Sequence, residues 1–243
     1  MPRGQPDYGL YAAKESSASI SDMGEVAARL GSIITYDKRG DVIDFDNFEN
    51  AVLKWAVSIS GVGGYARLDS TSVRSANQSV KLYTPATKDA YVELKRGYSV
   101  GRTKRLGIEV SISTLGTYSI FLLTLLYTTA TTKQTAKLKL DNELYELYIM
   151  TGNEIYTKID TLYEIFATEH WFNTMKVVAD FESSEYVRLM FDNNEYDISA
   201  LSPYLVSPWF GAPYIQLELK ILNKEDLEGV CYIDDVVLTQ AEP

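Results

Sequence analysis

From Asp44 onward, short hydrophobic segments alternate with turn-forming residues about every ten positions. Alternation of apolar and polar residues, as in Asn77–Tyr83 and Leu106–Ile112, is typical of strands with one buried face. Ile120–Tyr127 is almost continuously apolar, which predicts a central strand buried on both faces. About a dozen short strands and no long helix predict a two-sheet antiparallel sandwich. Further strands are predicted at Ala90–Leu94, Ala136–Leu140, Leu144–Met150, Glu154–Ile159, Thr174–Phe181, Tyr186–Phe191, Glu195–Ile198, Tyr214–Ile221 and Cys231–Leu238.

The N-terminal segment has a different pattern. Met1–Ser19 contains few large apolar residues, which is typical of an extended arm. Asp22 stands at N-cap spacing before Glu25, and this spacing predicts a helix of about two turns. Val26 and Leu30 are four positions apart and therefore share one face of that helix.

A hairpin is predicted between this helix and the sandwich. Ile33–Tyr36 and Val42–Ile43 flank the turn sequence Asp37–Asp41. We therefore divide the chain into residues 1–43, an N-terminal element, and residues 44–243, the sandwich.

The helix is too short to persist alone, so it needs a docking surface. Two interpretations stand. The surface is either the protein's own sandwich or a neighbouring subunit, and in the second case Tyr8, Val26 and Leu30 belong to an assembly arm.

Composition and charge exclude several classes of protein. The 243 residues are 46% hydrophobic, which is enough for one large domain with its own core. Residues 141–197 hold 13 Asp/Glu against 3 Lys/Arg, which accounts for the whole net charge of −10. This acidic segment argues against a nucleic-acid partner. The longest apolar stretch is too short to span a membrane, and the polar start has no signal-peptide core, which predicts synthesis in a cytoplasm without export.

Three stretches together resemble the concanavalin A-like, laminin-G-like jelly roll. The first is Asp44–Glu49 with Trp55, and the third is Tyr232–Leu238. The second consists of Trp171, Met175–Phe181, Tyr186–Arg188 and Asn194–Asp197. The first and third also resemble carbohydrate-binding modules of the same two-sheet layout. The resemblance covers roughly Asp44 to Thr239, and it is more specific for fold than for function.

The final predicted strand, Tyr232–Leu238, needs a partner because an unpaired edge invites aggregation. We expect it to pair with the opening strand, Asp44–Phe48. Strict alternation would place Ile233 and Val237 on the same face of this strand.

The N-terminal sequence resembles uncharacterised structural proteins of tailed bacteriophages. The residues that carry this resemblance are Met1–Gly9, Leu30–Ser32 and Asp37–Asp41. It implies a virion component, namely a head-decoration, spike or tail protein, whose partners are other virion proteins or copies of itself. A glycan-binding module is the alternative, and it explains the jelly roll but not the arm.

Catalysis is not indicated by the spacing of acids. Jelly-roll glucanases carry a Glu-x-Asp-x-x-Glu pattern on one strand, and the nearest approach here is Asp141, Glu143 and Glu146. Glu146 falls on the opposite face of a strand, whereas retaining hydrolysis needs two carboxyls about 5 Å apart in one cleft. His170 is the only histidine, and there is no Gly-x-Ser-x-Gly motif. The sequence therefore predicts a protein that is not an enzyme.

Calcium is the ion that the acidic residues favour. Asp46, Glu49 and Asp235, with Asp44 and Asp234 beside them, come from the two strands expected to pair. Carboxylate oxygens suit calcium, and the resemblance to carbohydrate-binding jelly rolls implies a structural calcium at this junction. The alternative is that these acids face solvent or cap turns. No other cofactor is predicted.

Aromatic residues suggest a contact surface. Trp209 and Phe210 lie in the Pro/Gly-rich segment Ser207–Pro213. They predict stacking on a glycan or on a protein partner, since loops at one end of a sandwich carry function. The alternative is that Trp209 closes the end of the sandwich core.

Overall fold

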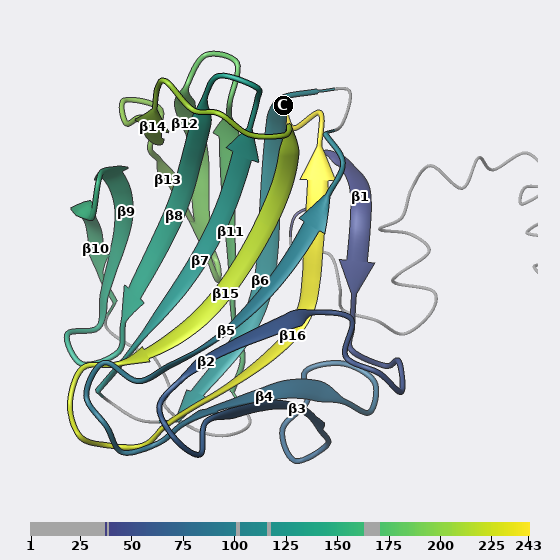
Figure 1. Cartoon of the computed structure of the whole chain (residues 1–243), viewed down its shortest axis with the longest axis vertical. Coiled ribbons are helices and arrows are strands. Elements are labelled where there is room, and N and C mark those ends of the chain that lie inside the picture. Colours follow the sequence, from purple (N-terminus) through teal and green to yellow (C-terminus); the bar gives the residue numbers. More distant parts are fainter. Residues whose placement is uncertain (1–36, 38, 101–102, 116–117, 163–170) are drawn as a thin grey trace, which may run out of the picture. The chain divides into compact units, whose positions relative to one another are not determined.

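Two antiparallel sheets enclose the hydrophobic core in the computed structural model, which describes residues 37, 39–100, 103–115, 118–162 and 171–243 (Figure 1). These described residues form sixteen strands and no helix. The architecture confirms the predicted all-β, two-sheet sandwich of jelly-roll type.

Sheet A has the strand order β13-β12-β11-β6-β16-β4-β3, and β1 pairs with β16 outside this path. Its strands are β1 (Asp41–Asp46), β3 (Tyr65–Asp69), β4 (Ser79–Thr84), β6 (Arg105–Leu115), β11 (Asn173–Asp180), β12 (Glu185–Phe191), β13 (Asn194–Asp197) and β16 (Gly229–Gln240).

Sheet B has the order β10-β9-β8-β7-β15-β5-β2, and β14 pairs with β8. Figure 1 shows this sheet in front of sheet A. Its strands are β2 (Ala56–Ser60), β5 (Tyr91–Tyr98), β7 (Ser119–Thr128), β8 (Lys133–Asp141), β9 (Glu146–Gly152), β10 (Ile155–Thr161), β14 (Tyr204–Val206) and β15 (Tyr214–Asn223).

The core consists of the side chains of the central strands that point into the space between the two sheets. Leu123 and Leu125 of β7, Leu138 of β8 and Leu217 of β15 are fully buried, and they face Val110 and its neighbours on β6 of sheet A. Burial of each large aliphatic side chain contributes about 1.5–3 kcal/mol. Because side chains alternate along a strand, the residues between these positions point out of sheet B and form its outward face.

The first strand pairs with the last, as predicted. Asp44 lies opposite Leu238, Phe45 opposite Val237 and Asp46 opposite Val236. This pairing places β1 on β16 in sheet A.

Strict alternation is wrong for β16, because the strand contains a bulge. Its register with β6 shifts between Asp234 and Val237, and Asp235 has a φ of 48°. Ile233 and Val236 therefore both belong to the core cluster, whereas Val237 points to the other face.

Residues 39–243 form one compact unit, and Val42 and Ile43 belong to β1. The first arm of the predicted hairpin, Ile33–Tyr36, lies outside the described residues. The arm residue Tyr8 and the helix residues Val26 and Leu30 lie outside the described residues, so the N-terminal element stays a prediction. Strands β2, β3 and β14 were not predicted.

Candidate functional site

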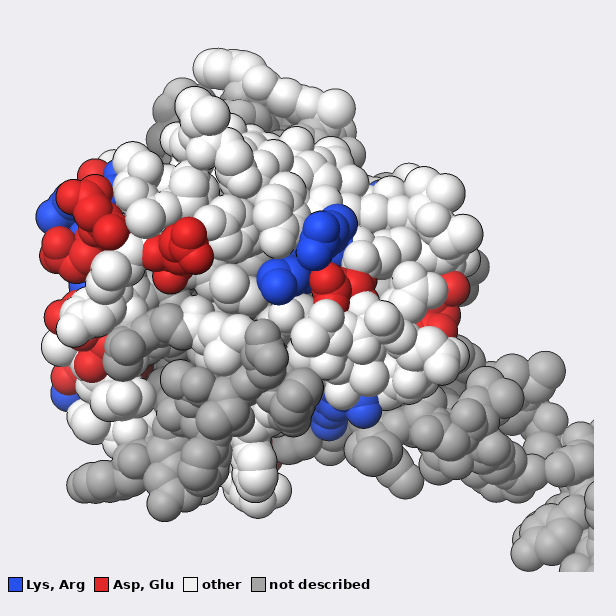
Figure 2. Space-filling view, turned by 90° about the horizontal axis from the view of Figure 1, so that it is seen from below, with Lys and Arg blue, Asp and Glu red and all other residues white. Residues whose placement is uncertain are grey.

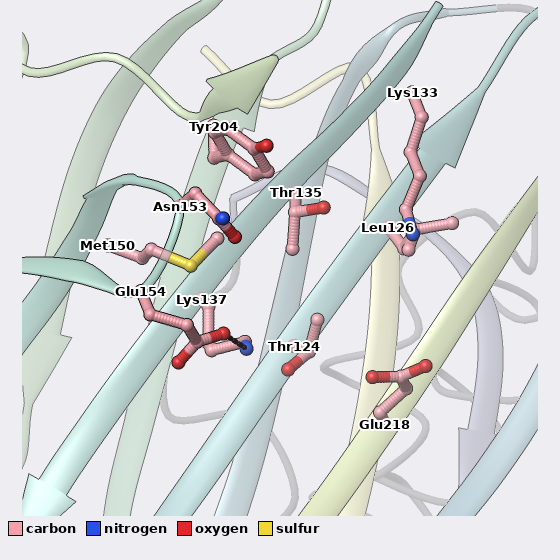
Figure 3. A pocket seen from close by; sticks show the side chains of 10 residues that line it. All are labelled: Thr124, Leu126, Lys133, Thr135, Lys137, Met150, Asn153, Glu154, Tyr204 and Glu218. Carbon is pink, nitrogen blue, oxygen red and sulfur yellow. Dashed lines mark hydrogen bonds and ion pairs between the residues drawn. The ribbon is translucent and has the colours of Figure 1, made fainter. Parts of the chain in front are cut away.

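A pocket lies on the outward face of sheet B, over strands β7, β8 and β15 (Figure 3). Its volume is about 190 Å³. Typical sites for drug-sized ligands measure about 300–1,000 Å³, so this pocket fits a single small ring rather than a large ligand.

The residues at the bottom of the pocket come from three neighbouring strands, and the strand register places them side by side. Thr124 in the middle of β7 lies opposite Lys137 on β8 and opposite Glu218 on β15. One step along the strands, Leu126 lies opposite Thr135. These positions all alternate with core residues, so their side chains point out of the sandwich.

Two further segments line the pocket on the side of β8. The short strand β14 pairs with β8 and places Tyr204 opposite Thr135. The β9–β10 turn contributes Asn153 and Glu154, and Glu154 holds a φ of 53°. Figure 3 shows these side chains on one side of the pocket and Glu218 on the other.

The pocket contains charges of both signs. Lys137 Nζ lies 3.3 Å from Glu154 Oε1. Lys133 makes no ion pair with any described residue, and its Nζ lies 5.2 Å from the centroid of the Trp209 ring. The Glu218 carboxylate accepts a hydrogen bond of 2.6 Å from Gln216 Nε2.

These groups suit a ligand with many hydroxyl groups. The pocket offers the hydroxyls of Thr124, Thr135 and Tyr204 and the amide of Asn153. A few polar groups around an apolar patch, here partly supplied by Met150, fix the orientation of a small ligand.

The acids Asp141, Glu143 and Glu146 do not enter the pocket. Both Asp141 carboxylate oxygens lie 3.2 Å from Lys224 Nζ, which also contacts Glu143. Glu146 pairs with Lys158, and this contact lowers the pKa of its carboxyl. The three acids therefore make ion pairs at one end of sheet B. His170 lies outside the described residues.

Both carboxylate oxygens of Asp46 accept hydrogen bonds from other residues of the protein, so they are not available as metal ligands. Its Oδ2 accepts hydrogen bonds from Trp55 Nε1 at 3.0 Å and from Arg96 Nη1 at 2.9 Å. Its Oδ1 accepts from the Phe48 backbone N–H at 3.0 Å. Asp44 pairs with the same Arg96 at 3.0 Å.

Glu49 and Asp235, the other two predicted calcium ligands, are close enough for their charges to interact. Glu49 Oε1 accepts backbone hydrogen bonds from Asn77 and Gln78. Asp235 Oδ1 accepts from Ser75 Oγ at 2.7 Å, while its buried Oδ2 has no hydrogen-bond partner and lies 3.9 Å from Arg74 Nη1. Burial raises the pKa of Asp235, and the charge of Glu49 adds to that effect.

The neighbouring Asp234 is buried too. Burial, and then the charge of Asp235, raises the pKa of Asp234 to about 7. Its Oδ2 accepts backbone hydrogen bonds from Arg74 at 2.9 Å and Ser75 at 3.1 Å.

Asp235 Oδ2 has no hydrogen-bond partner and meets Arg74 only at 3.9 Å, whereas Asp46 accepts hydrogen bonds at both oxygens and pairs with Arg96 at 2.9 Å. No group of three or more His, Cys, Asp or Glu side chains suited to a metal occurs among the described residues. Calcium at this junction stays a prediction, and it rests on Glu49 and Asp235.

Of the two predicted aromatic contact residues, Trp209 lies against a residue of the pocket. Trp209 is linked to it through Lys133, and the Trp209 backbone N–H donates to the Thr131 carbonyl at 2.8 Å. Phe210 is 85% exposed. Trp209 is thus held against the end of β8, while Phe210 faces solvent.

Charged residues are sparse on the face that Figure 2 shows, and they gather in small groups of mixed sign. That face therefore offers no broad basic surface for a phosphate backbone. None of the described residues forms a helix of the length and apolarity that a membrane-spanning segment needs.

No protein-family model matches the sequence, and no curated protein sequence matches it. Solved structures do match. The endo-β-1,4-glucuronan lyase of the fungus Trichoderma reesei aligns with a TM-score of 0.55 and 9% identity, over 82% of this chain and 95% of the lyase. The cellulose-induced protein Cip1 aligns with a TM-score of 0.56 and 12% identity, over 82% and 97%.

The catalytic domain of an endo-1,3-β-glucanase from Thermotoga petrophila aligns with a TM-score of 0.51 and 11% identity, over 83% of this chain and 98% of that domain. At these identities the likeness shows the fold alone. The prediction that the chain is not an enzyme is contradicted, because proteins that share this fold include a lyase and a glucanase catalytic domain. The matches give no support to the virion role.

Proposed function

We propose that this protein binds a carbohydrate on the outward face of sheet B, with the pocket over β8 as the centre of the site. The observation that carries the proposal is the pocket itself, where hydroxyl, amide, carboxylate and ammonium groups surround a small apolar patch. Sugar rings present the same combination of hydroxyl groups and apolar C–H faces.

The neighbouring strands leave room for a longer chain of sugars. The outward faces of β7, β15 and β5 continue from the pocket across sheet B. Exposed Phe210 and the segment around Trp209 stand at the end of β8 nearest Lys133. The names of two matching structures, a glucuronan lyase and an endo-1,3-β-glucanase, support a polysaccharide as the ligand.

The test is binding to a panel of neutral and acidic polysaccharides, measured by affinity electrophoresis and calorimetry. We expect at least one polysaccharide to bind, and Tyr204→Ala or Asn153→Ala to weaken it, because each substitution removes a hydrogen-bonding group from the pocket wall. Arg67→Ala, an exposed position on β3 in sheet A, is the matched control and leaves binding unchanged.

Each polysaccharide that binds is also incubated with the protein and assayed for new reducing ends and for unsaturated products. The first result identifies hydrolysis and the second identifies elimination, and either extends the proposal from binding to catalysis. Binding that is insensitive to Tyr204→Ala and Asn153→Ala moves the site away from this pocket.

The virion role predicted from the N-terminal sequence rests on residues outside the described part of the chain. It does not conflict with glycan binding, because an attached sandwich could carry the glycan site. We therefore make the glycan site the main proposal.

A further inference from the structure

We propose that the sugar held in this pocket is a uronosyl residue, so that the ligand is an acidic polysaccharide of the polyuronate class. This inference rests on the proposed function and names the ligand of the same pocket. It follows from how the charges are divided between the two sides of the pocket.

The cationic side is strand β8. Lys133 and Lys137 project from the same face of this strand, with Thr135 between them (Figure 3). Only 17% of the Lys137 side chain is exposed, so its ammonium group is partly shielded from water. Partial shielding strengthens its attraction for an anion.

The present partner of Lys137 is easy to displace. The Glu154 side chain is 70% exposed and stands on the β9–β10 turn. An ion pair with a largely exposed partner contributes little to stability, because water solvates that partner when the pair is broken. A ligand carboxylate can therefore replace Glu154 Oε1 at Lys137, while Glu154 Oε2 still accepts its hydrogen bond of 3.2 Å from Tyr156 Oη.

Lys133 is the second available cation. It makes no ion pair with a described residue, and its ammonium group rests over the Trp209 ring. A cation over an indole ring keeps its charge and its free N–H donors. Lys133 can therefore attract the carboxylate of a neighbouring sugar along the same chain.

The opposite side of the pocket accepts hydrogen bonds. Glu218 makes no ion pair with any described residue, since Lys95, which lies opposite it on β5, pairs with Glu93 at 2.8 Å; on its other side Glu218 lies opposite Thr124. A carboxylate only accepts hydrogen bonds, so Glu218 selects sugar hydroxyls and repels a second anion. A uronosyl ring, with one carboxylate and several hydroxyls, matches both sides, whereas a neutral ring brings no anion to Lys133 and leaves Lys137 paired with Glu154.

The experiment measures binding of the full chain to three polyuronates (polyglucuronate, polygalacturonate and alginate), to the neutral glucan laminarin and to dextran sulfate. We expect a polyuronate to bind at least about tenfold more tightly than laminarin, which is a difference of about 1.4 kcal/mol. We also expect this preference to shrink as sodium chloride is added, because salt screens the ion pairs.

Three variants assign the effect to residues. Lys137→Met should weaken polyuronate binding about tenfold or more and leave laminarin unaffected, since it removes the cation but keeps the chain length. Glu154→Gln should tighten polyuronate binding, because it frees Lys137 from its counterion. Lys81→Met is the control, since Lys81 also lies over an aromatic ring, that of Tyr232, but on β4 of sheet A.

The outcomes separate the two proposals. Equal binding of laminarin and polyuronates, abolished by Tyr204→Ala, would keep the glycan site and overturn the uronosyl assignment. Dextran sulfate binding as tightly as the polyuronates would also overturn it, since that would be unselective attraction of anions. If no polysaccharide binds, both proposals fail.

Discussion

Arg96 joins the two sheets at the level of single side chains. It projects from β5 of sheet B and pairs with Asp44 and Asp46 of β1 in sheet A. Its guanidinium group also lies within 5.8 Å of the Trp55 ring centroid and 5.5 Å of that of Tyr98. Asp44 in turn accepts a hydrogen bond of 2.7 Å from Tyr98 Oη, so one cation holds a cluster of two acids and two aromatic rings.

Arg96→Met should destabilise the protein by about 3–5 kcal/mol, because it leaves the buried Asp46 carboxylate without its cation. Chemical denaturation followed by tryptophan fluorescence measures this loss. Arg67→Met is the matched control. Arg67 is 59% exposed and pairs with Asp69, so its removal should cost at most about 1 kcal/mol. Equal losses in the two variants would show that Arg96 does not support the junction.

The contact that Asp46 makes could not be predicted from the sequence. Its spacing from Glu49 predicted a shared metal site, and the strand pairing behind that prediction is confirmed. The cation that it meets is Arg96, which lies 50 residues away on the other sheet. Local spacing contains no information about that contact, because it depends on how the sheets stack.

At the scale of elements, long hydrophobic or alternating segments were predicted well and several short strands were missed. The pattern located β15, whose buried residues repeat every second position over ten residues, and it located β7 and β11, which are buried along most of their length. It missed β14, which is three residues long and exists because it pairs with β8. It also misread the inward face of β16, because a bulge at Asp235 leaves no mark in the pattern.

The pocket could not be predicted for a related reason. Thr124, Lys137 and Glu218 come from β7, β8 and β15, and β15 lies beside β7 only because of the strand order in sheet B. The sequence singled out Trp209, whose ring lies against the pocket residue Lys133, and Phe210, and their role as contact residues stays a prediction. The composition of the loop drew attention to the two aromatic residues. The strand residues of the pocket are of types common in any strand, so only the strand register identifies them.

The β1–β16 junction carries the calcium prediction. Calcium should raise the melting temperature of the protein, and a chelator should lower it, because an ion that binds only the folded state adds about 2.7 kcal/mol at a concentration 100 times its Kd. Asp235→Asn should abolish the response, since Asp235 supplies a buried oxygen that has no hydrogen-bond donor and meets Arg74 only at 3.9 Å. Asp46→Asn should retain it, since Asp46 is neutralised by Arg96. A melting temperature that ignores both calcium and chelator would remove the metal from this junction.

Strand β2 forms an edge of sheet B that lacks the usual protection. Its sequence Ala-Val-Ser-Ile-Ser has no charge, and Val57 and Ile59 are exposed. Uncharged apolar edges pair with other chains, so the protein should self-associate at high concentration. Ser58→Lys should reduce this association without changing the melting temperature, because Ser58 lies opposite Glu93 on the outward face.

Sedimentation at increasing protein concentration measures the effect of the Ser58 substitution. Val62→Lys is the matched control, since it adds the same charge in the exposed turn that follows β2, outside the strand. Equal relief of association by both variants would point to net charge rather than to the strand edge.

At the scale of the whole molecule, residues 39–243 contain both sheets and the complete core. Arg39 belongs to this unit. Its carbonyl accepts a hydrogen bond of 3.3 Å from buried Lys176 Nζ, and its guanidinium group pairs with Glu195 at 2.9 Å. The sandwich therefore uses contacts two residues before β1, and a shortened chain should keep them.

We expect a chain that begins at Arg39 to unfold in one cooperative transition and to bind the same polysaccharide as the full chain, because both sheets, the core and the pocket are retained. Calorimetry and affinity electrophoresis check these two properties. If residues 1–38 form an assembly arm through Tyr8, Val26 and Leu30, the shortened chain loses the oligomers or particles that the full chain forms, which mass measurement in solution detects. Aggregation of the shortened chain would instead show that the N-terminal helix covers the protein's own sandwich, since removing it would expose apolar surface. A folded shortened chain that still enters particles would contradict the arm altogether, and attachment would then have to come from the sandwich.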